Sequence, residues 1–208
     1  MKSTSVKSLS VKSTFIAIAL ALAGSGLAQA QEQGAAVETQ RDANQQERIE
    51  QGLQSGQLNT KEAGRLERQE QHIDRQEAHD LKQGGTLTPE EKARINREQN
   101  QVSHNIYNDK HNGVTGNPNS ASSQRLQADV QRNANQQQRI TNGINSGQLS
   151  NKEAGHLEGG QAHVNRAEAN AAANGHVGAA EQARVQGKEN YQSNRVYDKK
   201  HNDKTRGD

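Results

Sequence analysis

Apolar side chains recur along the chain at helical spacing, in narrow stripes separated by polar residues. Leu66, Ile73 and Leu81 are seven and eight residues apart, and Ile95 and Val102 repeat the seven-residue step. Such spacing places each stripe on one face of an α-helix. A stripe this narrow favours antiparallel pairing of helices over a thick globular core. The pattern therefore predicts an all-α protein built from short helices with a thin core.

Helix-capping motifs mark where these helices begin. A capping box places Ser, Thr or Asn at the N-cap and Glu three residues later, so that each side chain satisfies a free backbone N–H of the other. The boxes are Thr88 with Glu91, Ser150 with Glu153 and, in a looser form, Asn59 with Glu62. Gly56 and Gly85 stand where the preceding helices are expected to end. Agreement between caps and apolar period indicates that the chain folds.

The chain contains an internal duplication. The run Arg41–Ile49 returns at Arg132–Ile140, and Lys110–Asn112 returns at Lys200–Asn202, so the offset is 91 residues at the start and 90 at the end. We expect two tandem copies, at 41–112 and 125–202, each an antiparallel hairpin or three-helix unit. Residues 113–124, which contain Gly, Asn, Pro and Ser, are expected to form a flexible linker.

The N-terminus has the pattern of a secretory signal peptide. Lys2, Lys7 and Lys12 precede an apolar run at 15–27, and Ala28-Gln29-Ala30 fits a cleavage site. We predict a signal peptide at 1–30, export to the periplasm or beyond, and no membrane span after cleavage. The alternative is a short membrane anchor. A polar segment at 31–40 and a tail at 203–208 complete the expected organisation.

Composition narrows the possible functions. Removing the three lysines of residues 1–30 changes the formal charge from +2 to −1, which leaves no strong field to attract nucleic acid or anionic lipid. The absence of Cys excludes a disulfide scaffold and a thiolate zinc finger. Only 29% of residues are hydrophobic, so stability is expected to be marginal and self-association could supplement it.

Histidines are the candidate ligands for a metal ion. All eight lie after residue 30, and two pairs occupy equivalent positions in the two copies: His72 with His163, and His111 with His201. We predict that these four bind Zn²⁺, Cu²⁺ or Ni²⁺, with ligands drawn from neighbouring helices or a second subunit. The alternative is that they are exposed polar positions. Tyr107 and Tyr197 are expected to pack against the helix ends beside them.

Catalytic motifs are missing from the sequence. There is no Gly-x-Ser-x-Gly elbow, no glycine-rich phosphate loop and no Asp-x-Asp-x-Asp-Gly calcium loop. The many Asp and Glu residues are expected to lie in solvated helical patterns. We predict a protein that is not an enzyme.

The organisation resembles small exported bacterial helical-repeat proteins of unknown function, through the Asn-Gln-Gln-x-x-Arg-Ile run and the closing Tyr-x-x-Lys-His-Asn. The segment Leu87-Thr88-Pro89-Glu90-Glu91 also resembles the Leu-Thr-x-x-Gln motif of Spy-type and zinc-resistance-associated periplasmic proteins, with Glu in place of Gln. This resemblance implies an α-helical protein of envelope or metal stress. We expect an exported binding protein; the alternatives are a ligand-free helical spacer or a Spy-like chaperone.

Overall fold

The computed structural model describes the backbone of residues 26–202 and the side chains of residues 34–202. This part of the chain forms six α-helices and no strand, which confirms the predicted all-α class. The helices are α1 (Gly26–Ser55), α2 (Thr60–Gly84), α3 (Pro89–His111), α4 (Ala121–Asn145), α5 (Asn151–Ala171) and α6 (Ala179–Lys200). Most of the predicted signal peptide, residues 1–25, and the tail at 203–208 lie outside the described residues.

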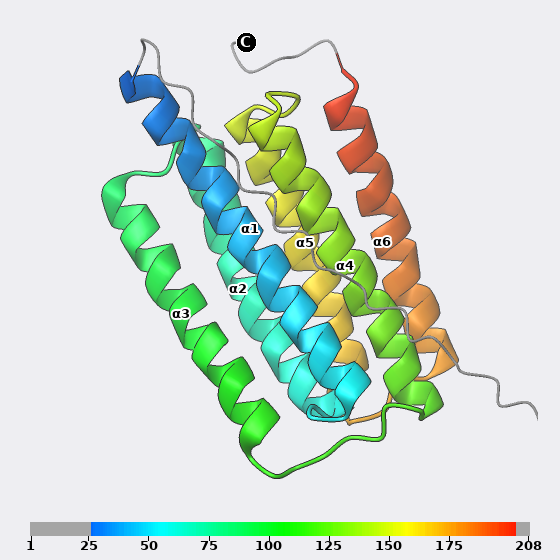
Figure 1. Ribbon diagram of the computed structural model, residues 1–208. Helices are drawn as coiled ribbons and strands as arrows, with labels where there is room; N and C mark the ends of the chain where they lie inside the picture. The colour runs from blue at the N-terminus through cyan, green and yellow to red at the C-terminus, as the bar shows by residue number, and fades with distance from the viewer. Residues whose placement is uncertain (1–25, 203–208) are drawn as a thin grey trace, which may run out of the picture.

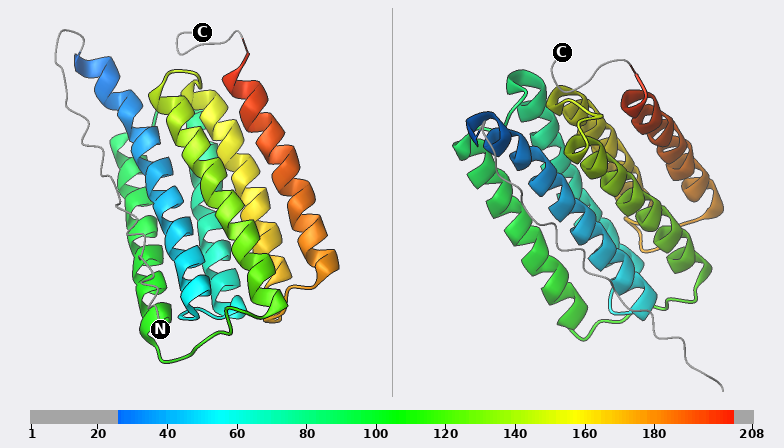
Figure 2. Two further views of the ribbon diagram at one scale, coloured as in Figure 1. Left: turned by 45° about the vertical axis from the view of Figure 1, so that its right-hand side comes forward. Right: turned by 45° about the horizontal axis from the view of Figure 1, so that its top comes forward.

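The helices form two layers with one further helix at each edge. Helices α1 and α4 lie side by side, and α2 and α5 lie side by side behind them (Figure 1). Helix α3 packs against α1 and α2 at one edge, and α6 packs against α4 and α5 at the other (Figure 2). The pairings of α1 with α4 and α2 with α5 join the two halves of the sequence, so the halves share one interior.

The predicted capping boxes are present at the starts of α2, α3 and α5. At α2, the backbone N–H of Glu62 donates to Asn59 Oδ1 over 2.9 Å, and the N–H of Asn59 donates to Glu62 Oε2 over 3.0 Å. Helix α6 begins differently, because Gly178 has no side chain to accept a hydrogen bond. Its backbone N–H still donates to Glu181 Oε2 over 2.8 Å.

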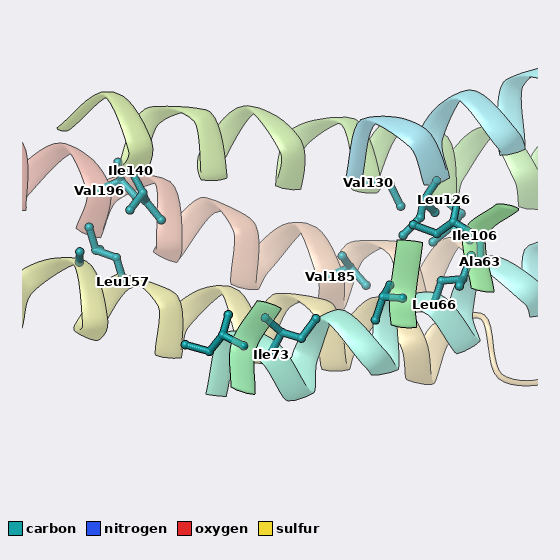
Figure 3. Packing of buried hydrophobic residues seen from close by; sticks show 14 of the residues in the cluster. Ala63, Leu66, Ile73, Ile106, Leu126, Val130, Ile140, Leu157, Val185 and Val196 are labelled. Carbon is teal, nitrogen blue, oxygen red and sulfur yellow. The ribbon is translucent and has the colours of Figure 1, made fainter. Parts of the chain in front are cut away.

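Apolar residues from all six helices form one buried cluster, which includes the contacts of each edge helix with its neighbours. Figure 3 shows Ile140, Leu157 and Val196 together, from α4, α5 and α6. Leu66 and Ile106 lie together in the same way between α2 and α3. All five are fully buried, and so are Ile73 and Ile95, which belong to the predicted apolar stripes. This apolar cluster does not fill the interior alone, because acidic and amide side chains are buried beside it.

The segment between α3 and α4 crosses the turn between α1 and α2. The backbone N–H of Gly116 donates to the carbonyl of Gly56 over 2.8 Å. A Cβ at Gly116 would lie 2.5 Å from the carbonyl oxygen of Leu58, so only glycine permits this approach. In the described part of the chain, no helix is both long and apolar enough to cross a membrane.

Candidate functional site

Acidic and amide side chains line the space between the four inner helices. On α2, Glu67, Glu70, Asp74 and Glu77 recur at intervals of three, four and three residues. This is the spacing at which bundle helices normally present leucine or isoleucine to each other. The equivalent positions on α5 carry Glu158, Gln161, Asn165 and Glu168. Seven of the carboxyl groups here are fully enclosed, one on α1, four on α2 and two on α5. We call them the central carboxylates: Asp42, Glu67, Glu70, Asp74, Glu77, Glu158 and Glu168.

The sequence-based expectation that the acidic residues are solvated is wrong for these positions. Glu67, Asp74, Glu158 and Glu168 have no exposed surface, and Glu70 is 1% exposed. The sequence alone is ambiguous here, because a Glu at every third or fourth position is also typical of the exposed face of a surface helix. Only the packing of α2 against α5 and α1 decides that this face points inward.

No basic side chain is buried with them: among the side chains of residues 34–202, every buried charged residue is an Asp or a Glu. Arginines reach only the outer acids. Arg94 Nη2 lies 2.8 Å from Asp80, and Arg132 Nη1 lies 3.1 Å from Glu189. The central carboxylates form no ion pair within the described part of the chain, and the more distant Arg41 and Arg48 offset the charge of Asp42 and Glu70 only in part.

Amide groups are the hydrogen-bond donors of the interior. Gln46 Nε2 donates to Glu67 over 2.9 Å, and the equivalent Gln137 donates to Glu158 over 3.0 Å. Asn165 Nδ2 of α5 reaches across to Asp74 of α2 over 2.8 Å. These bonds orient the carboxyl groups toward the axis of the bundle, but one amide N–H cannot neutralise a carboxylate.

Many buried oxygens still have no donor. Both carboxyl oxygens of Glu70 are buried without a hydrogen-bond partner. One oxygen each of Asp42, Glu67, Glu77 and Glu168 is in the same position. The amide oxygens of Gln46, Gln137 and Gln161 are also unpartnered. Each such acceptor costs about 1–3 kcal/mol when left unsatisfied. The interior thus has a surplus of oxygen acceptors that calls for protons or cations.

Burial and mutual repulsion raise the pKa values of these carboxyl groups. Burial raises the pKa of Asp42 and Glu67 to about 7 and that of Glu158 to about 8. Burial, followed by repulsion from Asp42 and Glu67, raises the pKa of Glu70 well above its usual range. The unpartnered oxygens of Asp42 and Glu77 face each other, as do those of Glu67 and Glu168, so that one shared proton would give each pair a hydrogen bond.

Asp74 lies at the centre of the acidic interior. Its pKa is raised well above the usual range by burial and then by Glu158, Asp42, Glu70 and Glu67, in that order. These neighbours come from three helices, α1, α2 and α5. A cation that entered this space would therefore meet carboxylates from several sides at once.

The structure does not bring the four predicted metal-binding histidines together. His72 is exposed on α2, with Nε2 3.9 Å from Glu98, and His163 is exposed on α5. His111 and His201 end α3 and α6, where each ring stacks on a tyrosine one turn earlier, with centroids 4.2 and 4.1 Å apart. Tyr107 and Tyr197 stay exposed. Histidine-mediated binding therefore stays a prediction.

No preformed metal centre exists among residues 34–202. In that part of the chain, no three His, Asp or Glu side chains are gathered in an arrangement able to hold a metal ion. The central carboxylates lie instead in successive layers along the bundle, joined in pairs. Carboxylates that converge on one ion would have to rotate about their side-chain bonds, as the three torsions of Glu allow.

Comparison with protein-family models, with curated proteins and with solved structures found no match.

Proposed function

We propose that this protein is a non-enzymatic, exported cation-binding protein whose ligands are the central carboxylates. The observation that carries the proposal is the composition of the interior, in which every buried charged side chain of residues 34–202 is acidic. Glu70, with two buried and unpartnered oxygens, points to a missing positive partner. Export is supported by the signal-peptide pattern of residues 1–30.

The donor atoms indicate the class of cation. Carboxylate and amide oxygens are hard ligands that favour Ca²⁺, Mg²⁺ and Mn²⁺, whereas imidazole favours Zn²⁺, Cu²⁺ and Ni²⁺. The interior offers oxygens alone, since no histidine of residues 34–202 is buried. Ca²⁺ accepts six to eight oxygens in flexible geometry, which suits a site assembled by rotation of Asp42, Glu70, Asp74 and Glu158.

Protons are the competing occupants of the same acceptors. A carboxyl group that is neutral because it is protonated needs no metal ion, and the raised pKa values of Asp42 and Glu67, about 7, allow this at neutral pH. Metal binding must displace those protons, so affinity for a cation increases with pH. Protons and metal ions are therefore distinguished by comparing the effect of an added cation at pH 5.0 with its effect at pH 7.5.

The test is thermal unfolding and calorimetric titration of the metal-free protein with Ca²⁺, Mg²⁺, Mn²⁺ and Zn²⁺. At pH 7.5 we expect a saturating hard cation to raise Tm by about 5–10 °C. The increase should be much smaller at pH 5.0. Asp74→Asn, which removes the central charge, should abolish the effect, and Asp198→Asn, on an exposed position of α6, should preserve it.

Two results would overturn the proposal. If none of the four cations changes Tm or releases heat at pH 7.5, the interior is held by protons alone. If Zn²⁺ binding survives Asp74→Asn and disappears in the double variant His72→Ala with His163→Ala, the histidines are the ligands instead.

A further inference from the structure

A basic groove follows helix α5 on the side away from the acidic interior. Two hollows of about 470 and 600 Å³ adjoin at His163. The first lies between α2 and α5 and is lined by Arg75, Lys82 and Arg166; the second lies between α5 and α6 and is lined by Arg184, Lys188 and Arg195. Neither hollow has an acidic lining residue. Six cationic side chains thus face one continuous surface.

The duplication supplies an internal comparison for this groove. His72 of the first copy is equivalent to His163, and Glu98 is equivalent to Lys188. In the first copy, His72 Nε2 lies 3.9 Å from the carboxylate of Glu98. In the second copy, an ammonium group stands where that carboxylate would be. The charge beside the histidine has therefore reversed from negative to positive.

A second position has lost its acid in the same way. Arg94 of the first copy pairs with Asp80 over 2.8 Å. The equivalent arginine is Arg184, and the residue equivalent to Asp80 is Ala171. Arg184 and Ala171 both line a third hollow, which shares Arg184 and Lys188 with the second and also includes Glu181; Arg184 forms no ion pair with a described residue. Its guanidinium is left available for an anion from outside the chain.

Two glycines of α5 let side chains of the neighbouring helices approach closely along the groove. Gly159 and Gly160 stand where the first copy has Arg68 and Gln69. Gly159 lines the first hollow and Gly160 the second. A Cβ at Gly160 would lie 2.5 Å from the side-chain amide carbon of Gln192, so any larger residue would fill this wall. The second copy has exchanged two long side chains for glycines, and the side chains of Gln192 and Arg195 from α6 pack against Gly160 in the wall of the second hollow.

The cations act together on His163. Burial and then Lys188, Arg166, Arg75 and Arg195 lower the pKa of His163. These four come from α2, α5 and α6, so the positive field is shared by three helices and is strongest where the hollows meet.

We infer that this groove binds a soluble anion carrying several phosphate groups, of the polyphosphate type. Cationic side chains lie on both sides of His163, so one phosphate would occupy each hollow, and Arg166 and Arg184 offer forked N–H donors that match phosphate oxygens. The site is concave, which suits a small linear anion better than the flat surface of a membrane. The inference is independent of the proposed cation-binding function, because the groove shares no residue with the central carboxylates.

The test is calorimetric titration in metal-free buffer with inorganic tripolyphosphate, with orthophosphate and with phosphatidylglycerol vesicles. We expect tripolyphosphate to bind more tightly than orthophosphate, with an affinity that falls as salt rises. Lys188→Glu restores the charge of the first copy and should weaken binding at least about tenfold, as should Arg184→Ala. Arg97→Glu is the matched charge control on an exposed position of α3, and it should leave the affinity unchanged.

The inference is overturned if tripolyphosphate produces no heat, or if Arg97→Glu weakens binding as much as Lys188→Glu does. Binding to vesicles without binding to tripolyphosphate also overturns it. Because the buffer contains no metal ion, failure here leaves the cation-binding proposal untouched.

Discussion

Glu70 has the surroundings least suited to its charge. The side chain is 1% exposed, neither carboxyl oxygen has a hydrogen-bond partner, and Asp42 and Glu67 lie close enough to repel it. An ionised carboxylate in such a place must take up a proton or a cation. Replacing Glu70 is therefore the most direct test of whether the buried negative charge destabilises the fold.

Glu70→Gln should stabilise the metal-free protein. The amide has the same shape and no charge, so at pH 7.5 we expect the free energy of unfolding to rise by about 1–3 kcal/mol, with a smaller gain at pH 5 because the raised pKa of Glu70 favours its neutral form there. Urea denaturation measures it. Glu90→Gln, on an exposed position, is the control and should change stability by less than about 0.5 kcal/mol. A loss of stability in Glu70→Gln would show that the ionised group has a partner.

Helices α2 and α5 approach each other more closely than ordinary side chains permit. A Cβ added at Gly64 would lie 2.6 Å from Ala172 Cβ, and one added at the equivalent Gly155 would lie 2.8 Å from Leu81 Cβ. The two glycines stand near opposite ends of the pair, one on each helix. They set the distance at which the carboxylates and amides of the two helices meet.

Gly155→Val should destabilise the protein by about 1–3 kcal/mol, because the added side chain pushes α5 away from α2. Gly187→Val is the matched control, since a Cβ there meets nothing within 4 Å. Its stability should be unchanged or slightly increased because glycine weakens a helix. Thermal unfolding of both variants, followed by circular dichroism, makes the comparison. Equal effects at the two positions would contradict the close packing.

The beginnings of the helices were accessible from the sequence, and the orientation of α2 was not. Thr88 and Ser150 mark helix starts through hydrogen bonds to residues three positions later, so the local sequence is enough to predict them. The burial of Leu66 and Ile73 is predictable for a similar reason, because their spacing places them on one helix face. The expectation of solvated acids fails at Glu67 and Asp74, each the neighbour of one of these residues. The acids at 67, 70, 74 and 77 keep the period of a bundle seam, and that regularity was the available signal.

The two sequence copies depend on each other for burial. Helices α1 and α2 pack against α4 and α5, and Gln137 of one copy donates to Asp74 of the other over 3.3 Å. The sequence does not predict this packing between copies, because the apolar residues of a helix do not show which other helix they contact. Each copy therefore gains from the other copy of the same chain the buried surface that it lacks alone.

A fragment ending at residue 116 should therefore fail to fold as a monomer. It would expose the inner faces of α1 and α2, whose partners lie in the other half. We expect a largely unfolded circular dichroism spectrum, with helix recovered when a fragment of residues 117–208 is mixed in. A fully helical, monomeric first half would contradict this dependence.

The whole protein should lose stability as pH rises. Burial raises the pKa of Asp42 and Glu67 to about 7 and of Glu158 to about 8, whereas in the unfolded chain these groups titrate near 4. Between those values the folded protein binds more protons than the unfolded chain. The free energy of unfolding in metal-free buffer should fall from about pH 4.5 to pH 8. Urea denaturation at intervals of one pH unit measures it, and a rising curve would contradict the buried positions of the carboxyl groups.

An interior made of amides and carboxyl groups also determines what happens when the protein is boiled. Once α2 unwinds, its inner face presents four ionised groups to water in place of leucines. Unfolded chains of this kind repel one another and contain few apolar segments that could pair as strands between molecules. Heated and cooled at neutral pH, the solution should stay clear and the helices should return.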